Sequence, residues 1–210
     1  MKFTLRWGGT VAAELHPLAV AVMDALRLLE DSGCCPVLDD GLAAGNAAVL
    51  TPSGTLLVSP SGRRRGTFDA DHAVELVTFD TDGWEAVYRS LDPATQPTSD
   101  APLHHCALLE AARLGWSVAP GASLHGHVLD TTRAAEELEL PISGEATQFS
   151  TPEDRLALVD LLRRAPYPEH RTVIRRDHGF FTLGADLADA RRSVVALAEH
   201  ARAARLLPSG

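Results

Sequence analysis

The chain has 210 residues, of which 45% are hydrophobic and 22% are charged. This composition is typical of a folded globular protein and excludes fibrous and disordered chains. Acidic residues outnumber basic residues by 28 to 19, and the resulting net charge of −9 argues against a binder of nucleic acid or anionic membranes. The length suffices for one substantial core, so we expect residues 1–210 to form a single domain.

Targeting signals and cysteine frameworks are not evident. No apolar run approaches the roughly 20 residues that a bilayer span needs, and the start MKFTLRWGGT lacks the apolar centre of a signal peptide. We therefore expect a cytoplasmic protein without a membrane partner. Cys34, Cys35 and Cys106 form no Cys-x-x-Cys pair, which predicts buried thiols rather than disulfides or a cysteine zinc site.

In the N-terminal half, one helix precedes several short strands. Apolar residues at helical spacing predict a helix over 16–30, which a Gly-Cys-Cys segment ends. The run AAVLTPSGTLLVSPSG at 47–62 places Pro-Ser-Gly turns after two β-prone segments, which predicts a hairpin. A further strand and turn are expected over 73–83, and strands at this spacing indicate a mixed sheet.

The middle of the chain predicts a helix followed by a buried strand. The helix covers 100–115 and begins at a capping residue, Ser99 or Asp100. After it, WSVAPGASLHGHVLDT at 116–131 is short, apolar and rich in small residues. We expect a buried strand there that ends near its two histidines.

The C-terminal part alternates helix, strand and helix. Acidic residues in a first turn predict a helix over 150–165, and helical spacing predicts another over 185–207. Between them, RTVIRRDHGFFTLG at 171–184 is a strand candidate. No internal repeat or interdomain linker interrupts this order, so the elements predict an α/β fold.

Three histidines and one carboxylate are candidates for a metal site. On a strand, His125 and His127 would point to the same face about 7 Å apart along the backbone, close enough to share an ion. On a loop or helix the pair would mean less, and without further ligands ordinary strand or loop histidines are the alternative. His178 before a glycine and Asp100 at a helix start would complete a set that suits Zn²⁺ or a similar divalent ion. Such an ion polarises a carbonyl and stabilises the enediolate beside it.

An ordered series of motifs resembles the class II aldolase/adducin superfamily, whose members include L-fuculose-phosphate aldolase and L-ribulose-5-phosphate 4-epimerase. In chain order the motifs are GLAAGNAAV at 41–49, LLVSPSG at 56–62, DADHAVELVTFDTDG at 69–83, PTSDAPLHH at 97–105, LHGH at 124–127 and DHGFFTLGADLADA at 177–190. The resemblance covers roughly residues 41–207. It implies a three-layer α/β/α domain whose central sheet is mixed, mainly antiparallel, and flanked by helices.

The resemblance also implies site residues and an assembly. His125, His127 and His178 would bind Zn²⁺, or Mn²⁺, Co²⁺ or Fe²⁺, and Asp100 would be the fourth ligand or the catalytic carboxylate. The family's phosphate pocket would map to Gly45, Asn46, Ser61, Gly62, Thr98 and Ser99. Backbone N–H groups, hydroxyls and a helix N-terminus can hold a phosphate there without a basic patch. Family members are commonly homotetramers with the site at a subunit interface, so we expect a homotetramer.

Departures from the family pattern bear on the reaction. Aldolases generally have Glu at the position of Asp100, whereas the 4-epimerases have Asp, and HGFFTLG also resembles the epimerase form. However, the segment before Asp154 offers Glu145 but no second Asp for an epimerase, and no C-terminal tyrosine follows Tyr167. Ala47 also replaces the usual serine of the Gly-Asn motif.

These observations favour a divalent-metal-dependent lyase of aldolase type. It would act on a small hydroxy-carbonyl compound, with sugar phosphates among the candidates, through a metal-bound enediolate. An epimerase or dehydratase of a sugar phosphate with the same metal site is the alternative. A non-catalytic, adducin-like binding protein is a third hypothesis, and the retained histidines argue against it.

Structural interpretations compete with the functional one at several positions. Asp100 could serve only as a helix cap, and the glycines and serines of the proposed pocket could be ordinary turn residues. For His104 and His105 we expect a place on a helix face rather than metal binding. The arginines at 63–65 are expected to form a solvated turn.

Overall fold

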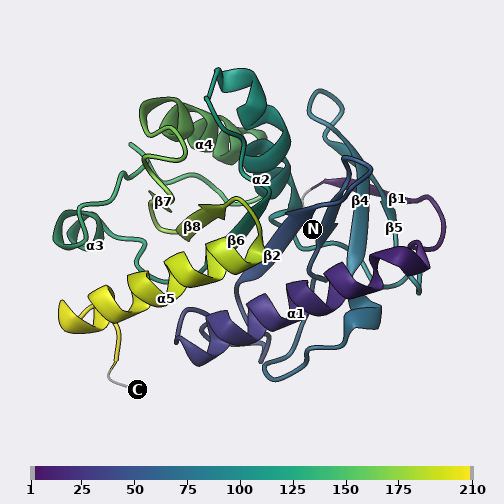
Figure 1. Ribbon diagram of the computed structural model, residues 1–210, viewed down its shortest axis with the longest axis horizontal. Coiled ribbons are helices and arrows are strands. Elements are labelled where there is room, and N and C mark those ends of the chain that lie inside the picture. Colours follow the sequence, from purple (N-terminus) through teal and green to yellow (C-terminus); the bar gives the residue numbers. More distant parts are fainter. Residues whose placement is uncertain (1–2, 209–210) are drawn as a thin grey trace.

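The computed structural model describes residues 3–208, and its centre is one eight-stranded sheet (Figure 1). The strand order is β1-β5-β4-β3-β2-β6-β8-β7. The strands are β1 Thr4–Trp7, β2 Asn46–Leu50, β3 Leu56–Val58, β4 Val74–Asp80, β5 Glu85–Arg89, β6 Ala122–Gly126, β7 Thr172–Arg175 and β8 Gly179–Gly184. Strands β1 and β5 pair in parallel and the other neighbours pair antiparallel, which confirms the expected mixed, mainly antiparallel sheet.

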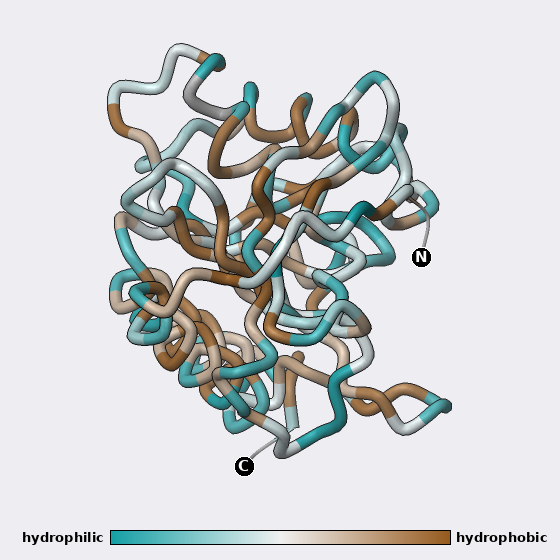
Figure 2. Tube along the Cα trace, turned by 90° about the vertical axis from the view of Figure 1, so that its right-hand side faces the viewer, coloured by the Kyte–Doolittle hydropathy of each residue, from teal (hydrophilic) through white to brown (hydrophobic). Residues whose placement is uncertain are grey.

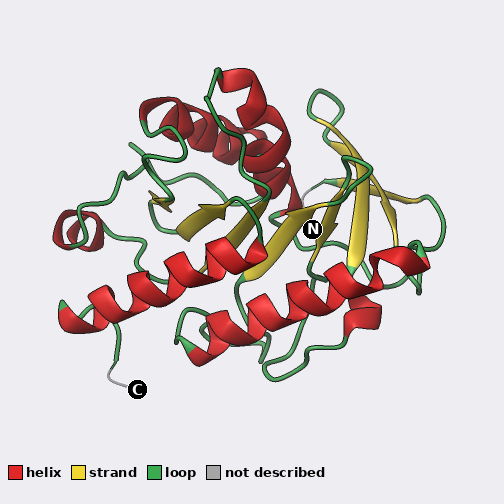
Figure 3. Ribbon diagram, viewed as in Figure 1, coloured by secondary structure: helices red, strands yellow, loops and turns green. Residues whose placement is uncertain are grey.

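Helices cover both faces of this sheet. The α-helices are α1 His16–Asp31, α2 Ala101–His105, α3 Thr132–Glu137, α4 Pro152–Arg164 and α5 Leu187–Ala203. The shorter helical turns are η1 Ala13–Leu15, η2 Ala70–His72, η3 Cys106–Glu110 and η4 Ala111–Leu114. Helices α1 and α5 lie side by side on one face, and α2 and α4 lie on the other (Figure 3). The expected three-layer α/β/α architecture is therefore confirmed.

Alternation along β6 directs its polar side chains toward the α2 and α4 layer. Leu124 packs in the core beneath α1 and α5, together with Leu26 and Val194. Its neighbour His125 points to the opposite face, where its ring stacks on Phe181 with centroids 4.1 Å apart. Successive strand residues face opposite sides of a sheet, so one register fixes both the core contact and the direction of the histidine.

The interior of the molecule is apolar and its loops are hydrophilic. Figure 2 shows brown, hydrophobic segments concentrated at the centre of the trace and teal segments on outer loops.

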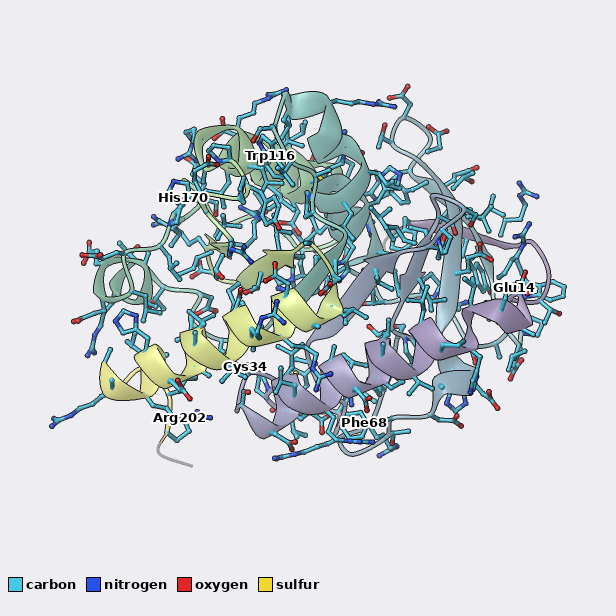
Figure 4. The ribbon with its side chains drawn as sticks, in the orientation of Figure 1. Glu14, Cys34, Phe68, Trp116, His170 and Arg202 are labelled. Atoms are coloured by element: carbon cyan, nitrogen blue, oxygen red, sulfur yellow. The ribbon has the colours of Figure 1, made fainter. Side chains whose placement is uncertain are left out.

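Cys34, Cys35 and Cys106 are free and buried, as expected. Figure 4 labels Cys34 and Arg202 where α1 and α5 approach each other, and the Arg202 guanidinium donates to the Ser32 carbonyl at 2.8 Å there. Within the described part of the chain, no helix combines the length and hydropathy that a membrane span requires.

The segment 171–184 is a hairpin and not the single strand expected from the sequence. Strands β7 and β8 pair antiparallel, and the turn between them passes through Asp177 at φ 57° and Gly179 at φ 145°. A Cβ atom on Gly179 would lie 2.0 Å from the Gly126 carbonyl oxygen, so the chain can turn here only with glycine. This turn holds His178 beside the end of β6.

The other observed helices and strands agree with the sequence-based predictions to different extents. The hairpin of β2 and β3 and the long helices α1, α4 and α5 confirm the predictions. The helix expected over 100–115 begins as α2, widens into the π-helical η3 and tightens into η4 before Gly115 ends it at φ 76°. Strands β1 and β5 and helix α3 were not predicted, since each is only four to six residues long.

Candidate metal centre and substrate pocket

Four side chains from three separate parts of the chain meet at one point. Asp100 directly precedes α2, His125 lies in β6, His127 follows β6, and His178 lies in the turn between β7 and β8. Each offers one ligand atom, and these atoms all lie within 4.8 Å of one another. The structure thus brings together all four residues that the sequence selected as a metal set.

The distances from the carboxylate to the three imidazoles are close to those of a coordination shell. The Asp100 carboxylate lies 3.4 Å from His178 Nε2, 3.5 Å from His127 Nε2 and 3.8 Å from His125 Nε2. For metal–ligand bonds of about 2.0–2.1 Å, neighbouring ligand atoms of a tetrahedron lie roughly 3.3–3.4 Å apart. The carboxylate–imidazole distances are therefore within a few tenths of an ångström of tetrahedral values, and the four ligand atoms, all within 4.8 Å of one another, can close around a small divalent ion.

The tautomer of His125 leaves a lone pair facing the cluster. Its Nδ1 lies 2.7 Å from the Phe180 carbonyl oxygen, which can only accept, so Nδ1 carries the proton. Nε2 is then an unprotonated acceptor, fully buried and without a hydrogen-bond partner. A buried polar atom without a partner is costly, and coordination of a cation would satisfy it.

Asp100 does not cap its helix. It occupies the N-cap position of α2, but its side chain makes no capping hydrogen bond and turns into the cluster instead. The Asn46 side-chain amide donates to Asp100 Oδ2 at 2.7 Å, and the Ser150 hydroxyl lies 3.5 Å from Oδ1. The cap interpretation is therefore wrong, because both carboxylate oxygens are directed at the site.

A buried hydrogen-bond chain supports Asp100 from behind. Because the Asn46 amide nitrogen donates to Asp100, the Asn46 Oδ1 is free to accept from His104 Nε2 at 2.6 Å. His104 Nδ1 must then accept from the Ser123 hydroxyl at 2.6 Å. Burial lowers the pKa of His104 to about 4, so the ring is neutral and keeps this tautomer. His104 lies outside the cluster, as expected, yet it orients Asn46, and sequence reasoning missed this link.

Burial and the contacts between carboxylates and imidazoles set the charge state of the cluster. Burial by itself would raise the pKa of Asp100, but the facing histidines hold it well below its usual value. Burial lowers the pKa of His125, and the neighbouring rings lower it further. Burial would also lower the pKa of His178, but the carboxylates of Asp100 and Asp154 raise it to about 9. Protonation of His178 therefore competes with the binding of a cation by the cluster.

A pocket of about 290 Å³ opens onto this cluster. Its lining includes every residue that the sequence assigned to substrate binding: Gly45, Asn46, Ser61, Gly62, Thr98 and Ser99. Asp100, His127 and His178 also line it, whereas His125 is completely buried behind them. The pocket thus joins the predicted phosphate segment to the predicted metal set.

Sequence reasoning did not assign Phe149 or Asp177 to the pocket, and it misplaced Arg63. Phe149 lines the pocket, its ring centroid 5.5 Å from that of His178, and Asp177 adds an exposed carboxylate. The local sequence does not indicate that either residue lies in the pocket, because both come from loops. The expected solvated turn at 63–65 is wrong for Arg63, which is buried in an ion pair with Glu30 and lines the pocket wall.

The residues present fit a divalent metal. Three imidazoles and one carboxylate form the nitrogen and oxygen donor set that zinc and similar ions prefer. Two of the Nε2 atoms, those of His125 and His178, are buried without hydrogen-bond partners among the described residues. The third imidazole, of His127, is partly exposed and faces the pocket.

Comparison with known proteins gives a consistent result. Residues 21–204 match the family model described as Class II Aldolase and Adducin N-terminal domain. A methylthioribulose-1-phosphate dehydratase of Pseudomonas paraeruginosa is 25% identical over 201 residues, covering 85% of this chain and 89% of that protein. A protein of the same name from Pseudomonas fluorescens is 26% identical, covering 85% and 88%.

Solved structures share the fold. A sugar-phosphate aldolase from Thermotoga maritima superposes with a TM-score of 0.66 over 91% of this chain and 94% of that chain, at 16% sequence identity. The sheet and its helical layers are therefore those of a known architecture. At this identity the likeness concerns the fold alone.

Proposed function

We propose that this chain, which belongs to the class II aldolase and adducin family, is a divalent-metal-dependent lyase. Its substrate would be a small phosphorylated hydroxy-carbonyl compound. The observation that carries the proposal is the convergence of Asp100, His125, His127 and His178 at the floor of the pocket. A divalent ion held there would polarise the substrate carbonyl and stabilise negative charge developing beside it.

In this proposal the three histidines and Asp100 are the metal ligands. Asp100 is better suited to ligation than to proton transfer, because both of its oxygens already face cluster or support groups. Asn46 supports Asp100 with one amide hydrogen and can offer only the other to a substrate. The metal identity that we propose is Zn²⁺, with Mn²⁺, Co²⁺ and Fe²⁺ as alternatives.

We propose that another part of the pocket lining holds the phosphate. It combines small residues, which let a ligand approach the backbone, with the hydroxyls of Ser61, Thr98 and Ser99. Ser99 and Asp100 precede α2 and lie at its N-terminal end. A few local donors of this kind suffice for a dianion even in a chain of net charge −9.

Loss of water is the reaction we place first, ahead of the aldol cleavage that the sequence motifs favoured. The specific reason is that both curated relatives are named as dehydratases and are matched along most of their length. The cleavage reaction also lacks its usual tyrosine, since the Tyr88 hydroxyl donates to the Pro93 carbonyl and Tyr167 packs against Trp116. Aldol cleavage through the same metal site is the second candidate.

The remaining alternatives have weaker support. The epimerase would need a second aspartate at the substrate. Asp154 has no exposed surface and Glu145 is exposed and outside the pocket lining, so Asp177, which lines the pocket beside His178, would have to take that role. A purely adducin-like binding role would leave no reason for three imidazoles to converge on one carboxylate. An enzyme accounts for this convergence directly.

A product assay tests the proposal. The chain, loaded with Zn²⁺, Mn²⁺, Co²⁺ or Fe²⁺ in turn, is incubated with five- and six-carbon ketose 1-phosphates, including methylthioribulose 1-phosphate, and the products are identified by mass spectrometry. A product lighter by one water supports dehydration, and two smaller carbonyl compounds support cleavage. Absence of any metal-dependent product across this panel would contradict the lyase assignment.

A further inference from the structure

We propose that Asp154 is a positioning residue of the metal centre, which fixes the imidazole of His178 through its Nδ1 atom. This inference rests on the metal site of the proposed function and deepens it. Asp154 has no exposed surface and is absent from the pocket lining, so it cannot touch a substrate. Any effect on the chemistry must therefore pass through His178.

The two ring nitrogens of His178 face two different carboxylates. Nε2 lies 3.4 Å from Asp100 in the cluster, and Nδ1 lies 3.5 Å from Asp154 Oδ2 on the far side of the ring. Neither nitrogen has a hydrogen-bond partner within residues 3–208. The Nδ1 distance is a few tenths of an ångström beyond a normal hydrogen bond, and a small ring rotation would close it. The carboxylate can only accept, so Nδ1 would carry the proton and Nε2 would keep its lone pair for the metal.

Asp154 is itself rigidly held in the orientation that this role requires. Its Oδ1 accepts from Arg175 Nε at 3.1 Å, from Arg175 Nη2 at 2.6 Å and from the Thr147 hydroxyl at 3.0 Å. Among the described residues, its Oδ2 accepts only the Ser150 backbone N–H, at 3.1 Å. Oδ1 is thus saturated, whereas Oδ2 retains a lone pair that faces His178.

The arrangement matches that of His125 but uses a stronger acceptor. Behind His125 the acceptor is the Phe180 backbone carbonyl, and behind His178 it is a carboxylate. A carboxylate behind a metal-binding imidazole fixes its tautomer and raises its basicity, and loss of such a group typically weakens metal affinity or activity 10–100-fold. A competing interpretation is that Asp154 exists only to neutralise buried Arg175, to which it is paired.

Cobalt titration distinguishes the two interpretations. Asp154→Asn keeps the size of the side chain and an oxygen for Arg175, but it weakens the acceptor for His178. We expect Co²⁺ to bind the variant 10–100-fold more weakly than the wild type, with an altered visible absorption spectrum of the bound ion. Asp160→Asn is the matched control, because Asp160 is exposed on the same helix and pairs with Arg164. The Co²⁺ affinity and spectrum of this variant should equal those of the wild type.

The outcomes separate this inference from the proposed function. If the wild type binds no Co²⁺, the metal site and the proposed function fail. If the wild type binds Co²⁺ and Asp154→Asn binds it equally with an unchanged spectrum, the positioning role is overturned and the metal site stands. If the variant does not fold, ¹⁵N NMR of the zinc-loaded wild type decides: a protonated Nδ1 on His178 supports the role, and an unprotonated Nδ1 overturns it.

Discussion

The imidazole of His178 occupies the position in the cluster where a proton and a metal ion compete. Two buried carboxylates raise its pKa to about 9, so the metal-free ring is protonated at neutral pH. A metal ligand must be deprotonated, and a bound ion must therefore displace this proton. The positive charge beside the Asp100 and Asp154 carboxylates is supplied either by the proton on His178 or by the metal ion.

The affinity for Zn²⁺ should consequently fall as the pH is lowered. Below the His178 pKa of about 9, each unit of acidification costs up to about tenfold in apparent affinity, so we expect a decline of about tenfold per unit between pH 8 and pH 6. Calorimetric titration in buffers of different ionisation enthalpy should show release of about one proton per ion at pH 7. An affinity independent of pH over this range would contradict the expectation.

His104 acts on the same site through hydrogen bonds alone. His104→Ala should remove a partner from both Asn46 and Ser123, each of which is buried. An unsatisfied buried polar group costs about 1–3 kcal/mol, so we expect the free energy of unfolding in urea to drop by at least about 2 kcal/mol. His200→Ala, at an exposed position of α5, should leave it within about 0.5 kcal/mol. Equal losses in the two variants would refute the role of the buried chain.

At the scale of elements, the hairpin between β7 and β8 determines whether the cluster closes. Gly179→Ala would place a Cβ 2.0 Å from the Gly126 carbonyl at a backbone conformation that L side chains rarely adopt. We expect a loss of more than about 2 kcal/mol in the free energy of unfolding, together with loss of zinc binding.

Gly144→Ala is the control for this substitution, because a Cβ there meets nothing within 4 Å. Thermal and urea unfolding should leave this variant within about 0.5 kcal/mol of the wild type. If Gly179→Ala were as stable as this control and bound zinc normally, the hairpin turn would not be the constraint that we describe.

The sequence predicted the long elements and the four cluster residues, but not the hairpin and the buried contacts that hold these residues in place. Helices α1, α4 and α5 have enough turns for an apolar period to stand out, and His125 and His127, in and just after β6, are two positions apart as on a strand. The sequence does not distinguish the hairpin from one strand, because only three residues, 176–178, separate β7 from β8. Asp154 was seen only as a first-turn acid of α4, since its partners His178 and Arg175 lie more than twenty residues away.

At the scale of the whole molecule, we propose the homotetramer that the family resemblance implies. Light scattering of the purified chain should then give four times the mass of one chain. Phe149, half exposed at the pocket, and Leu38, also exposed in its lining, are apolar surfaces that a neighbouring subunit could cover. A monomer at micromolar concentration with full metal-dependent activity would contradict an interfacial active site.

Metal stoichiometry tests the central claim most directly. Protein prepared without chelator, then dialysed against excess Zn²⁺ and freed of unbound ion, should hold one ion per chain by elemental analysis. His125→Ala removes a fully buried ligand, and we expect its affinity to fall by more than the roughly 10–100-fold typical of outer-shell partners, so that it retains no zinc after the same treatment. Wild-type protein without zinc, or a His125→Ala variant with an undiminished full equivalent, would contradict the account.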